Sequence, residues 1–350
     1  IVMKNILFVS SEAHPLIKTG GLADVAGSLP IALSELGQDV RILIPKYQVL
    51  KLENDVEYRC TIRTDNRDVN IFETRLPNSD VIVWLVDCPE YFDMPGNPYT
   101  DEFGNSWANN AARFSLFCRV AVEISQNRAY LDWKVDVVHC NDWQTGLVPA
   151  LLTLEPQRPA TVFTIHNMAY QGLFSKETYF DLNLPGQLWN PNDLEFHDML
   201  SFIKGGIACA DHITTVSPNY ALEIQTAEYG YGLEGLLESR HNELNGIING
   251  IDTDLWNPEV DTRIAGQYTI NNLAKKSANK SALQKHYELP EDPNIPVIAL
   301  IGRLVEQKGI DLVIDCLEIL AKYPMQFVLL GSGGKGFEHR LKNLSYLLPD

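Results

Sequence analysis

The sequence predicts an α/β fold with two domains, each built on a parallel sheet. Three observations support this prediction. Short apolar strands alternate with segments of helical length through most of the chain, which is typical of parallel sheets covered by helices. The chain has 350 residues, which is long for one hydrophobic core. Each half also opens with a strand, a basic loop that contains glycine, and a helix.

The elements of the first half follow in order. Residues 6–9 predict a strand, and the loop after it leads to a helix that Pro30 should kink or split. Three strand-like runs between residues 56 and 86 predict a hairpin insertion rather than a crossover. The other predicted elements are strands at 39–44, 135–139, 161–165 and 213–216, helices at 107–128 and 193–210, and the closing segment 247–252.

The second half is shorter. Residues 253–276 are irregular and contain Pro258, so they predict a connection between a domain at 1–250 and a domain at 251–350. Two parallel strands with helices cannot cover both faces of such a sheet, so we expect the second domain to be partial. Its predicted elements are helices at 280–287 and 310–322 and strands at 297–301 and 327–330.

Composition narrows the possible partners. The net charge of −17 disfavours nucleic acid and anionic membranes, which attract clustered Lys and Arg. A neutral polymer or a small metabolite fits better. No apolar run is long enough to span a bilayer, and the start of the chain lacks the parts of a signal peptide. A cytoplasmic location is therefore expected.

The cysteines and histidines do not predict a metal or a redox site. The eight histidines show no spacing typical of metal ligands, so we expect no bound metal and no cofactor. The cysteines are widely spaced, form no C-x-x-C pair, and are interpreted as reduced core residues. They are Cys60, Cys88, Cys118, Cys140, Cys209 and Cys316.

The segment from Lys18 to Asp24 lies between the first strand and its helix. Gly20 and Gly21 would let the backbone approach an anion, the N–H groups at a helix start have no partners, and Lys18 adds a positive charge. The loop matches neither the Walker nor the dinucleotide fingerprint. A phosphate site and an ordinary turn with a solvated lysine both remain open on this segment alone.

The second half has a similar basic loop between the strand at 297–301 and its helix. Arg303 and Lys308 lie where a helix N-terminus would meet an anion, although both could be ordinary surface charges. Together with the Lys18 loop they predict two groups of positive charge, one per domain, that could clamp a diphosphate.

A glycine-rich run from Gly331 to Gly336 matches the dinucleotide pattern and supports an alternative, a nicotinamide-dependent dehydrogenase. The run follows the second strand of its domain, and the acidic residue that would bind ribose is not present. A turn that contacts a nucleotide through Gly331 and Gly333, or simply a tight turn, is the favoured interpretation.

Polar residues follow two further strands. Asp142 and Trp143 come after the strand at 135–139, and His166 and Asn167 come after the strand at 161–165. Ligands of open parallel sheets bind at the carboxyl ends of strands, so these polar residues are candidates for a ligand site. Asp142 could accept hydrogen bonds from hydroxyls, but it could also cap the following helix, and His166 could be a structural histidine.

These motifs together resemble bacterial glycogen synthase and plant starch synthase. The similarity runs through essentially the whole chain and in the family's order. The most specific strings are Lys18 to Asp24 and His166 to Gly172, and the others are Asn141 to Trp143, Asn249 to Asp252, and Gly302 to Gly309.

The resemblance implies a fold of two Rossmann-like domains, of the GT-B glycosyltransferase type, with the second domain partial. It implies metal-independent, retaining transfer of glucose from ADP-glucose to the non-reducing end of an α-1,4-glucan. Residues matching Arg303 and Lys308 would stabilise the leaving diphosphate with help from the Gly20–Gly21 backbone. The remaining implied roles are His166 near the reacting carbon, Asp142 and Asn249 beside the sugar, Tyr99 and Asn167 in the donor pocket, and Lys18 near nucleotide and acceptor.

The resemblance has one departure. The family's later segment, which carries a glutamate that binds the donor glucose, has no counterpart in this sequence. We therefore expect a fragment whose transferase activity alone is small or absent. The choice between ADP-glucose and UDP-glucose, and a noncatalytic glucan-binding module as a second alternative, remain open at this stage.

Overall fold

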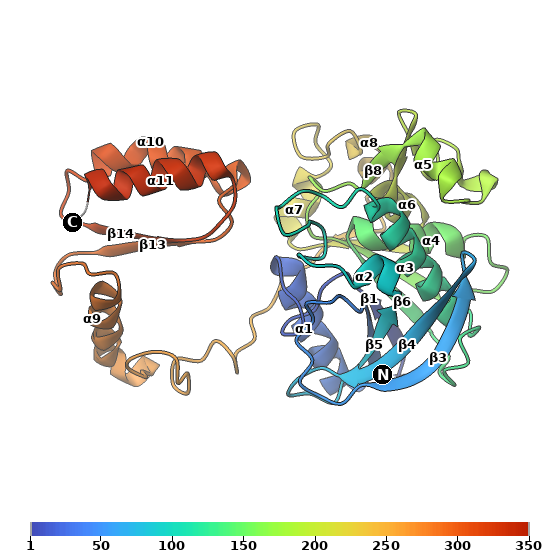
Figure 1. The fold of residues 1–350 in the computed structure, drawn as a ribbon, viewed down its shortest axis with the longest axis horizontal. Coiled ribbons are helices and arrows are strands. Elements are labelled where there is room, and N and C mark those ends of the chain that lie inside the picture. Colours follow the sequence, from blue (N-terminus) through green and yellow to red (C-terminus); the bar gives the residue numbers. More distant parts are fainter. Residues whose placement is uncertain (1, 349–350) are drawn as a thin grey trace. The chain divides into compact units, whose positions relative to one another are not determined.

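The computed structural model describes residues 2–348. The chain forms two compact units, Ile1–Gly250 and Ile251–Asp350, with the same bounds as the two domains expected from the sequence. Figure 1 shows the helices and strands of each unit. Among the helices of residues 2–348, none is long and apolar enough to cross a bilayer.

The first unit is built on one large sheet. Within the described residues it has nine strands in the order β12-β11-β7-β6-β1-β2-β5-β4-β3. Neighbours from β12 to β5 run parallel, whereas β4 pairs antiparallel with β5 and β3, which confirms the predicted hairpin insertion. The strands are β1 (Asn5–Val9), β2 (Asp39–Pro45), β3 (Glu57–Thr64), β4 (Arg67–Arg75), β5 (Ile82–Asp87), β6 (Val137–Asn141), β7 (Ala160–Ile165), β11 (His212–Thr215) and β12 (Leu244–Gly246).

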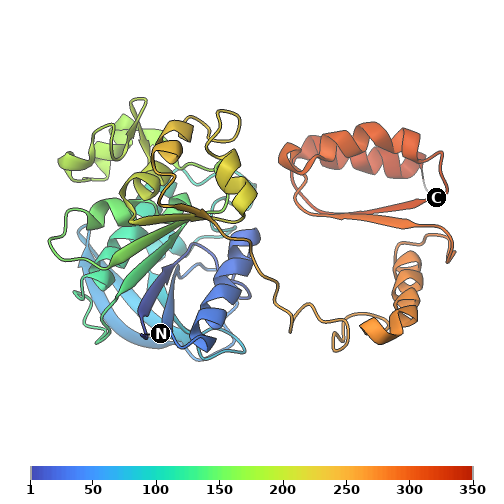
Figure 2. The same cartoon turned by 180° about the vertical axis from the view of Figure 1, so that it is seen from behind.

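Helices cover both faces of this sheet (Figures 1 and 2). Successive side chains of β1 point to opposite faces, so Leu7 packs in one apolar cluster with Phe117 of α3, and Phe8 packs in another with Ala26 of α1. The helices of this unit are α1 (Gly21–Glu35), α2 (Pro89–Phe92), α3 (Asn110–Ser125), α4 (Leu147–Leu152), α5 (Lys176–Asp181), α6 (Phe202–Cys209), α7 (Pro218–Glu223) and α8 (Glu234–Ser239), with 3-10 turns η1 (Trp143–Thr145) and η2 (Gly186–Leu188).

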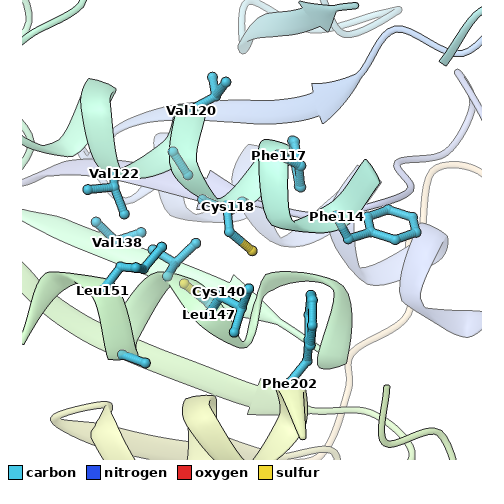
Figure 3. Packing of buried hydrophobic residues seen from close by; sticks show 14 of the residues in the cluster. Phe114, Phe117, Cys118, Val120, Val122, Val138, Cys140, Leu147, Leu151 and Phe202 are labelled. Carbon is cyan, nitrogen blue, oxygen red and sulfur yellow. The ribbon is translucent and has the colours of Figure 1, made fainter. Parts of the chain in front are cut away.

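The cysteines are free; three of the six are buried in the core as predicted, and Cys60 and Cys209 are partly buried against it. Figure 3 shows Cys118 of α3 and Cys140 of β6 among apolar side chains, and burial raises the pKa of the Cys118 thiol to about 12. Cys316 contradicts the prediction because it is exposed. It lies outside the buried stripe of its helix, which consists of Ile310, Ile314 and Leu317.

Two expected helices differ from the observed ones. Pro30 does not split α1, which runs unbroken through it; Pro30 is buried, and its neighbours Leu29 and Ile31 pack against the core. The helix expected from residue 193 begins only at Phe202, because a small antiparallel sheet precedes it. That sheet consists of β8 (Leu173–Ser175), β9 (Glu195–Phe196) and β10 (Met199–Ser201).

The turn between β9 and β10 explains this difference. His197 and Asp198 both have positive φ, at 51° and 61°, which is the backbone of a tight hairpin turn and cannot continue a helix. The Ser201 side chain then accepts from the N–H of Lys204 and caps the start of α6. The closing segment 247–252 follows directly on β12, which ends at Gly246.

The second unit has a two-stranded parallel sheet within the described residues, as predicted. Helices α10 and α11 lie on the same face of this sheet (Figures 1 and 2), where Leu304, Ile310 and Ile314 form a small core. Its elements are η3 (Ile270–Lys276), α9 (Ser277–His286), β13 (Val297–Ile301), η4 (Glu306–Lys308), α10 (Ile310–Leu320), β14 (Gln326–Leu330) and α11 (Lys335–Leu347).

Candidate active site

The predicted site residues of the first unit, Asn249 excepted, lie at or near the carboxyl ends of β1, β6 and β7, which are adjacent in the sheet. From β1 the chain adds β2 on one side, and from β6 it adds β7 on the other side, so the strand order reverses between the parallel neighbours β1 and β6. Open α/β sheets bind their ligands at such a switch point. The Asn141 amide at the end of β6 donates to the carbonyl oxygen of Val9 at 3.0 Å, so the ends of these two strands are tied together.

The loop after β1 is held from below by Glu12, a residue that the sequence analysis missed. Its side chain is buried, with 2% of its surface exposed. It accepts hydrogen bonds from the Thr19 N–H at 2.5 Å, the Thr19 hydroxyl at 2.6 Å and the Gly20 N–H at 3.3 Å. The strand-end rule that identified Asp142 also applies to Glu12, which follows β1 by three positions.

Gly20 and Gly21 face open space. Within residues 2–348, no heavy atom lies within 4 Å of the position that a Cβ would take on either glycine, apart from their own neighbours in the chain. The Gly20 N–H is engaged by Glu12, and the Ala23 N–H donates to the Gly20 carbonyl oxygen at 3.3 Å. The N–H groups of Gly21 and Leu22, at the start of α1, are therefore the ones that could meet an anion. Lys18 pairs with Asp24 at 2.7 Å, but both side chains are exposed and such pairs are weak.

Tyr99 joins the same network. Its hydroxyl donates to Glu12 at 2.5 Å and lies 2.8 Å from the Ser11 hydroxyl. Burial and the charge of Glu12 raise the pKa of Tyr99 well above its usual value. The structure therefore brings Tyr99 and the Lys18 loop together, although they are about eighty positions apart in the chain.

Asp142 has an unusual backbone. Its φ is 57° and its ψ is −179°, a region that is costly for any residue except glycine. Its carboxylate accepts from the His166 N–H at 2.7 Å. It makes no capping bond to the following turn, so the capping hypothesis is wrong. Burial raises the pKa of Asp142, while His166 and the N–H groups of His166 and Asn167 act to lower it.

The His166 ring is oriented by Asn141. Because the Asn141 amide nitrogen donates to Val9, its oxygen faces His166 Nε2 at 3.0 Å. This pattern assigns the proton to Nε2 and leaves Nδ1 of a neutral ring as a hydrogen-bond acceptor. Burial lowers the pKa of His166, against the charges of Asp142 and Glu12.

Trp143 lines an open cavity of about 520 Å³ beside this cluster. Its ring packs edge-on against Phe114 and Phe202. Gly172 has a φ of 60°, and a Cβ there would overlap the Trp143 ring, so both its conformation and its contact require glycine. The other residues that line the cavity are Ala169, Tyr170, Gln171, Leu173 and Tyr231.

The two predicted asparagines have different positions. Asn167 follows His166 directly, and its side chain accepts from the Ala169 N–H at 3.0 Å. Asn249 is exposed on the segment after β12, which β7 and β11 separate from β6 in the sheet. The first unit therefore places Asn167, but not Asn249, beside Asp142.

The remaining predicted residues lie in the second unit. Arg303 follows β13, and Lys308 ends η4 just before α10. The loop after β14 packs against this segment: the Leu304 N–H donates to the Ser332 oxygen at 2.8 Å, and the Gly334 N–H donates to the Leu304 oxygen at 2.9 Å. A Cβ on Gly331 or Gly333 would collide with this backbone.

This packing accounts for Gly331 and Gly333 without a dinucleotide. Close approach of two backbones requires glycine at these positions whatever the loop binds. In residues 2–348, no group of three or more His, Cys, Asp or Glu side chains is arranged to hold a metal ion.

A family model and two curated relatives all relate this chain to glycogen and starch synthases. Residues 5–239 match the family described as starch synthase catalytic domain. Glycogen synthase 1 of Methylococcus capsulatus is 52% identical over 345 residues, which are 99% of this chain and 70% of that protein. Glycogen synthase of Cellvibrio japonicus is 52% identical over 351 residues, which are 99% of this chain and 73% of that protein.

A solved structure agrees. The catalytic domain of starch synthase IV from Arabidopsis thaliana, bound to ADP and acarbose, superimposes with a TM-score of 0.89 at 30% identity. The match covers 99% of this chain and 72% of that one, so it extends over both Rossmann-like units of the GT-B fold. This chain therefore belongs to the glycogen and starch synthase family of glycosyltransferases.

Proposed function

We propose that this protein transfers glucose from ADP-glucose to the non-reducing end of an α-1,4-glucan, with retention at the transferred carbon and without a metal. Family membership supports this function, and so does the similar starch synthase that was solved with ADP and acarbose. The observation that carries the proposal is the cluster of Glu12, Asp142 and His166 at the switch point, next to the Lys18 loop. A cytoplasmic location remains a prediction.

Three features of the first unit suit a diphosphate. The first turn of α1 has N–H groups without helical partners, and its positive dipole end favours an anion. Lys18 lies just before that turn, in a weak exposed pair that a phosphate can replace. Open space at Gly20 and Gly21 leaves room for a close approach.

In the second unit, Arg303 and Lys308 are the proposed catalytic cations. When the bond to glucose breaks, negative charge grows on the departing diphosphate. Fixed positive charges that meet this growing charge lower the barrier more than they tighten ground-state binding. Gly309 supports this arrangement, since its φ of 69° turns the chain from Lys308 into α10.

Asp142 and His166 are proposed to bind the transferred glucose. Asp142 offers carboxylate oxygens as acceptors for hydroxyls, and neutral His166 offers Nδ1 in the same way. Tyr99 and Asn167 border this region, and we propose Asn249 as a further sugar contact. The packing of Gly331 and Gly333 removes the main support for the dehydrogenase alternative.

The proposal is tested by glucose transfer with the intact protein that contains this chain. Radiolabelled ADP-glucose and maltooligosaccharide should give a longer oligosaccharide and ADP, and 31P NMR can follow release of the diphosphate. Parallel reactions with UDP-glucose compare the two donors. Binding of NAD without any response to ADP would contradict the proposal, as would affinity for glucan without turnover.

Lys308→Ala should lower kcat by about 10²- to 10³-fold, the range for removal of one group that stabilises developing negative charge. KM for ADP-glucose should change much less, because the cation acts mainly in the transition state. Lys322→Ala is the matched control, since Lys322 is exposed after the end of α10. Equal kcat values for the two variants would exclude this role for Lys308.

A further inference from the structure

We propose that Glu12 is a positioning residue of the transfer site, which holds the Lys18–Gly21 loop and the Tyr99 hydroxyl in one arrangement. The kinetic part of this inference rests on the proposed function. The structural part does not, because it concerns hydrogen bonds within this chain. Glu12 itself is buried below the loop.

The contacts of Glu12 require a carboxylate. All its partners donate: the Thr19 N–H and hydroxyl, the Gly20 N–H, and the Tyr99 hydroxyl. An ionised carboxyl group only accepts, whereas a glutamine would present an NH₂ group to some of these donors. These hydrogen bonds are partly buried, and donors shielded from water are costly to leave without an acceptor, so this set of bonds favours one loop geometry.

Tyr99 is fixed at both ends. On its backbone side, the buried Arg113 of α3 donates to the carbonyl oxygen of Pro98 at 2.9 Å. The Asn110 side chain, also of α3, donates to the carbonyl oxygen of Tyr99 at 3.0 Å. In front, Glu12 and Ser11 hold its hydroxyl. Glu12 thus connects the Tyr99 segment, which α3 anchors, to the loop that begins α1.

The charge of Glu12 also affects Asp142 and His166, the two residues proposed to bind the glucose. It acts to raise the pKa of Asp142 and the pKa of His166, although no hydrogen bond joins Glu12 to either residue among those described here. One buried carboxylate is therefore coupled to the loop, to Tyr99, and to both residues at the ends of β6 and β7.

The experiment compares Glu12→Gln with Glu73→Gln in the intact protein. Glu73 on β4 is a matched control, because it is a partly buried carboxylate that accepts from the Trp84 ring N–H at 2.8 Å, far from the site in the sheet order. Glu12→Gln should lower kcat/KM for ADP-glucose by about 10²-fold, which is typical of a small misplacement of binding groups. Glu73→Gln should leave kcat/KM within about twofold.

Amide hydrogen exchange gives a readout that needs no turnover. The Thr19 and Gly20 amides should exchange at least tenfold faster in Glu12→Gln than in wild type and should be unchanged in Glu73→Gln. If wild type lacks transferase activity but these amides respond, the proposed function fails and the positioning role stands. Unchanged exchange in a folded Glu12→Gln variant would overturn the inference.

If Glu12→Gln does not fold, the milder substitution Thr19→Val tests the same inference. Thr19→Val removes only the Thr19 hydroxyl and keeps both N–H bonds to Glu12. It should reduce kcat/KM severalfold and speed exchange at Gly20, with a normal melting temperature. Wild-type kinetics and exchange in Thr19→Val would count against the proposal.

Discussion

The loop after β1 and the loop after β13 share one sequence pattern but are stabilised in different ways. In the first, a buried side chain, Glu12, binds the loop backbone. In the second, the backbone of Leu304 pairs with the loop after β14. The glycines differ accordingly: Gly21 of the first loop faces open space, whereas Gly333, in the loop after β14 that packs on the second, touches the Leu304 backbone. The same residue type thus leaves room for a ligand beside α1 and room for another stretch of backbone beside Leu304.

The largest effect on stability should come from Gly333→Ala. A Cβ there would lie within 3 Å of the nitrogen, carbonyl carbon and oxygen of Leu304, which are backbone atoms that cannot rotate away. Overpacking costs about 1–3 kcal/mol, and we expect the upper end, measured as the free energy of unfolding of the second unit in urea. Gly336→Ala, in open space on α11, is the control and should not destabilise. Equal stability of the two variants would break the comparison.

The free energy of unfolding of the first unit should depend on pH through the buried His139. Burial lowers the pKa of His139 to about 3, from the 6.5 of an unfolded chain. Between these values the unfolded state binds more protons, so this contribution is present above pH 6.5 and is lost as the pH falls toward 3. The loss at pH 5 is about 2 kcal/mol.

This acid sensitivity belongs to the first unit, because His139 lies on β6. His139→Asn should therefore flatten the slope of unfolding free energy against pH between 6.5 and 5, as followed by tryptophan fluorescence. Parallel slopes for wild type and variant would show that other groups govern acid stability.

The smallest effect should be that of Gly21→Ala. The chain has space for the methyl group, and alanine favours a helix start over glycine, so the melting temperature should not fall. A ligand that approaches this backbone would meet the methyl group, and kcat/KM for ADP-glucose should drop about tenfold, or about 1.4 kcal/mol. Gly235→Ala, in open space on α8, is the control. Full activity of Gly21→Ala would mean that the ligand does not approach there.

Sequence patterns predicted the strands well where the chain has uninterrupted apolar runs. The strand at 297–301 is confirmed residue for residue as β13, because an apolar run bounded by turn residues has few alternatives. The polar strand ends were also found, since Asp142 and His166 do meet. The same signals did not reveal the hairpin before α6, which depends on positive φ at His197 and Asp198 rather than on hydrophobic period.

Glu12 was missed for a different reason. The strand-end rule applies to Glu12, but a glutamate in a polar run looks like a solvated residue, and the rule does not show that Thr19 and Tyr99 surround it in the folded chain. The roles of the glycines were equally hidden. Gly20 and Gly331 both stand in glycine-rich loops, and what distinguishes them is whether another backbone lies within contact distance.

The backbone of Asp142 costs the protein folding stability, whereas its carboxylate has a proposed role in activity. Its backbone conformation is one that glycine adopts without strain, so Asp142→Gly would relax a cost of order 1–3 kcal/mol. The same change would delete the carboxylate that orders the His166 backbone. A change that stabilises the backbone would therefore remove the carboxylate to which we assign a sugar-binding role, so Asp142→Gly should raise the free energy of unfolding while lowering activity.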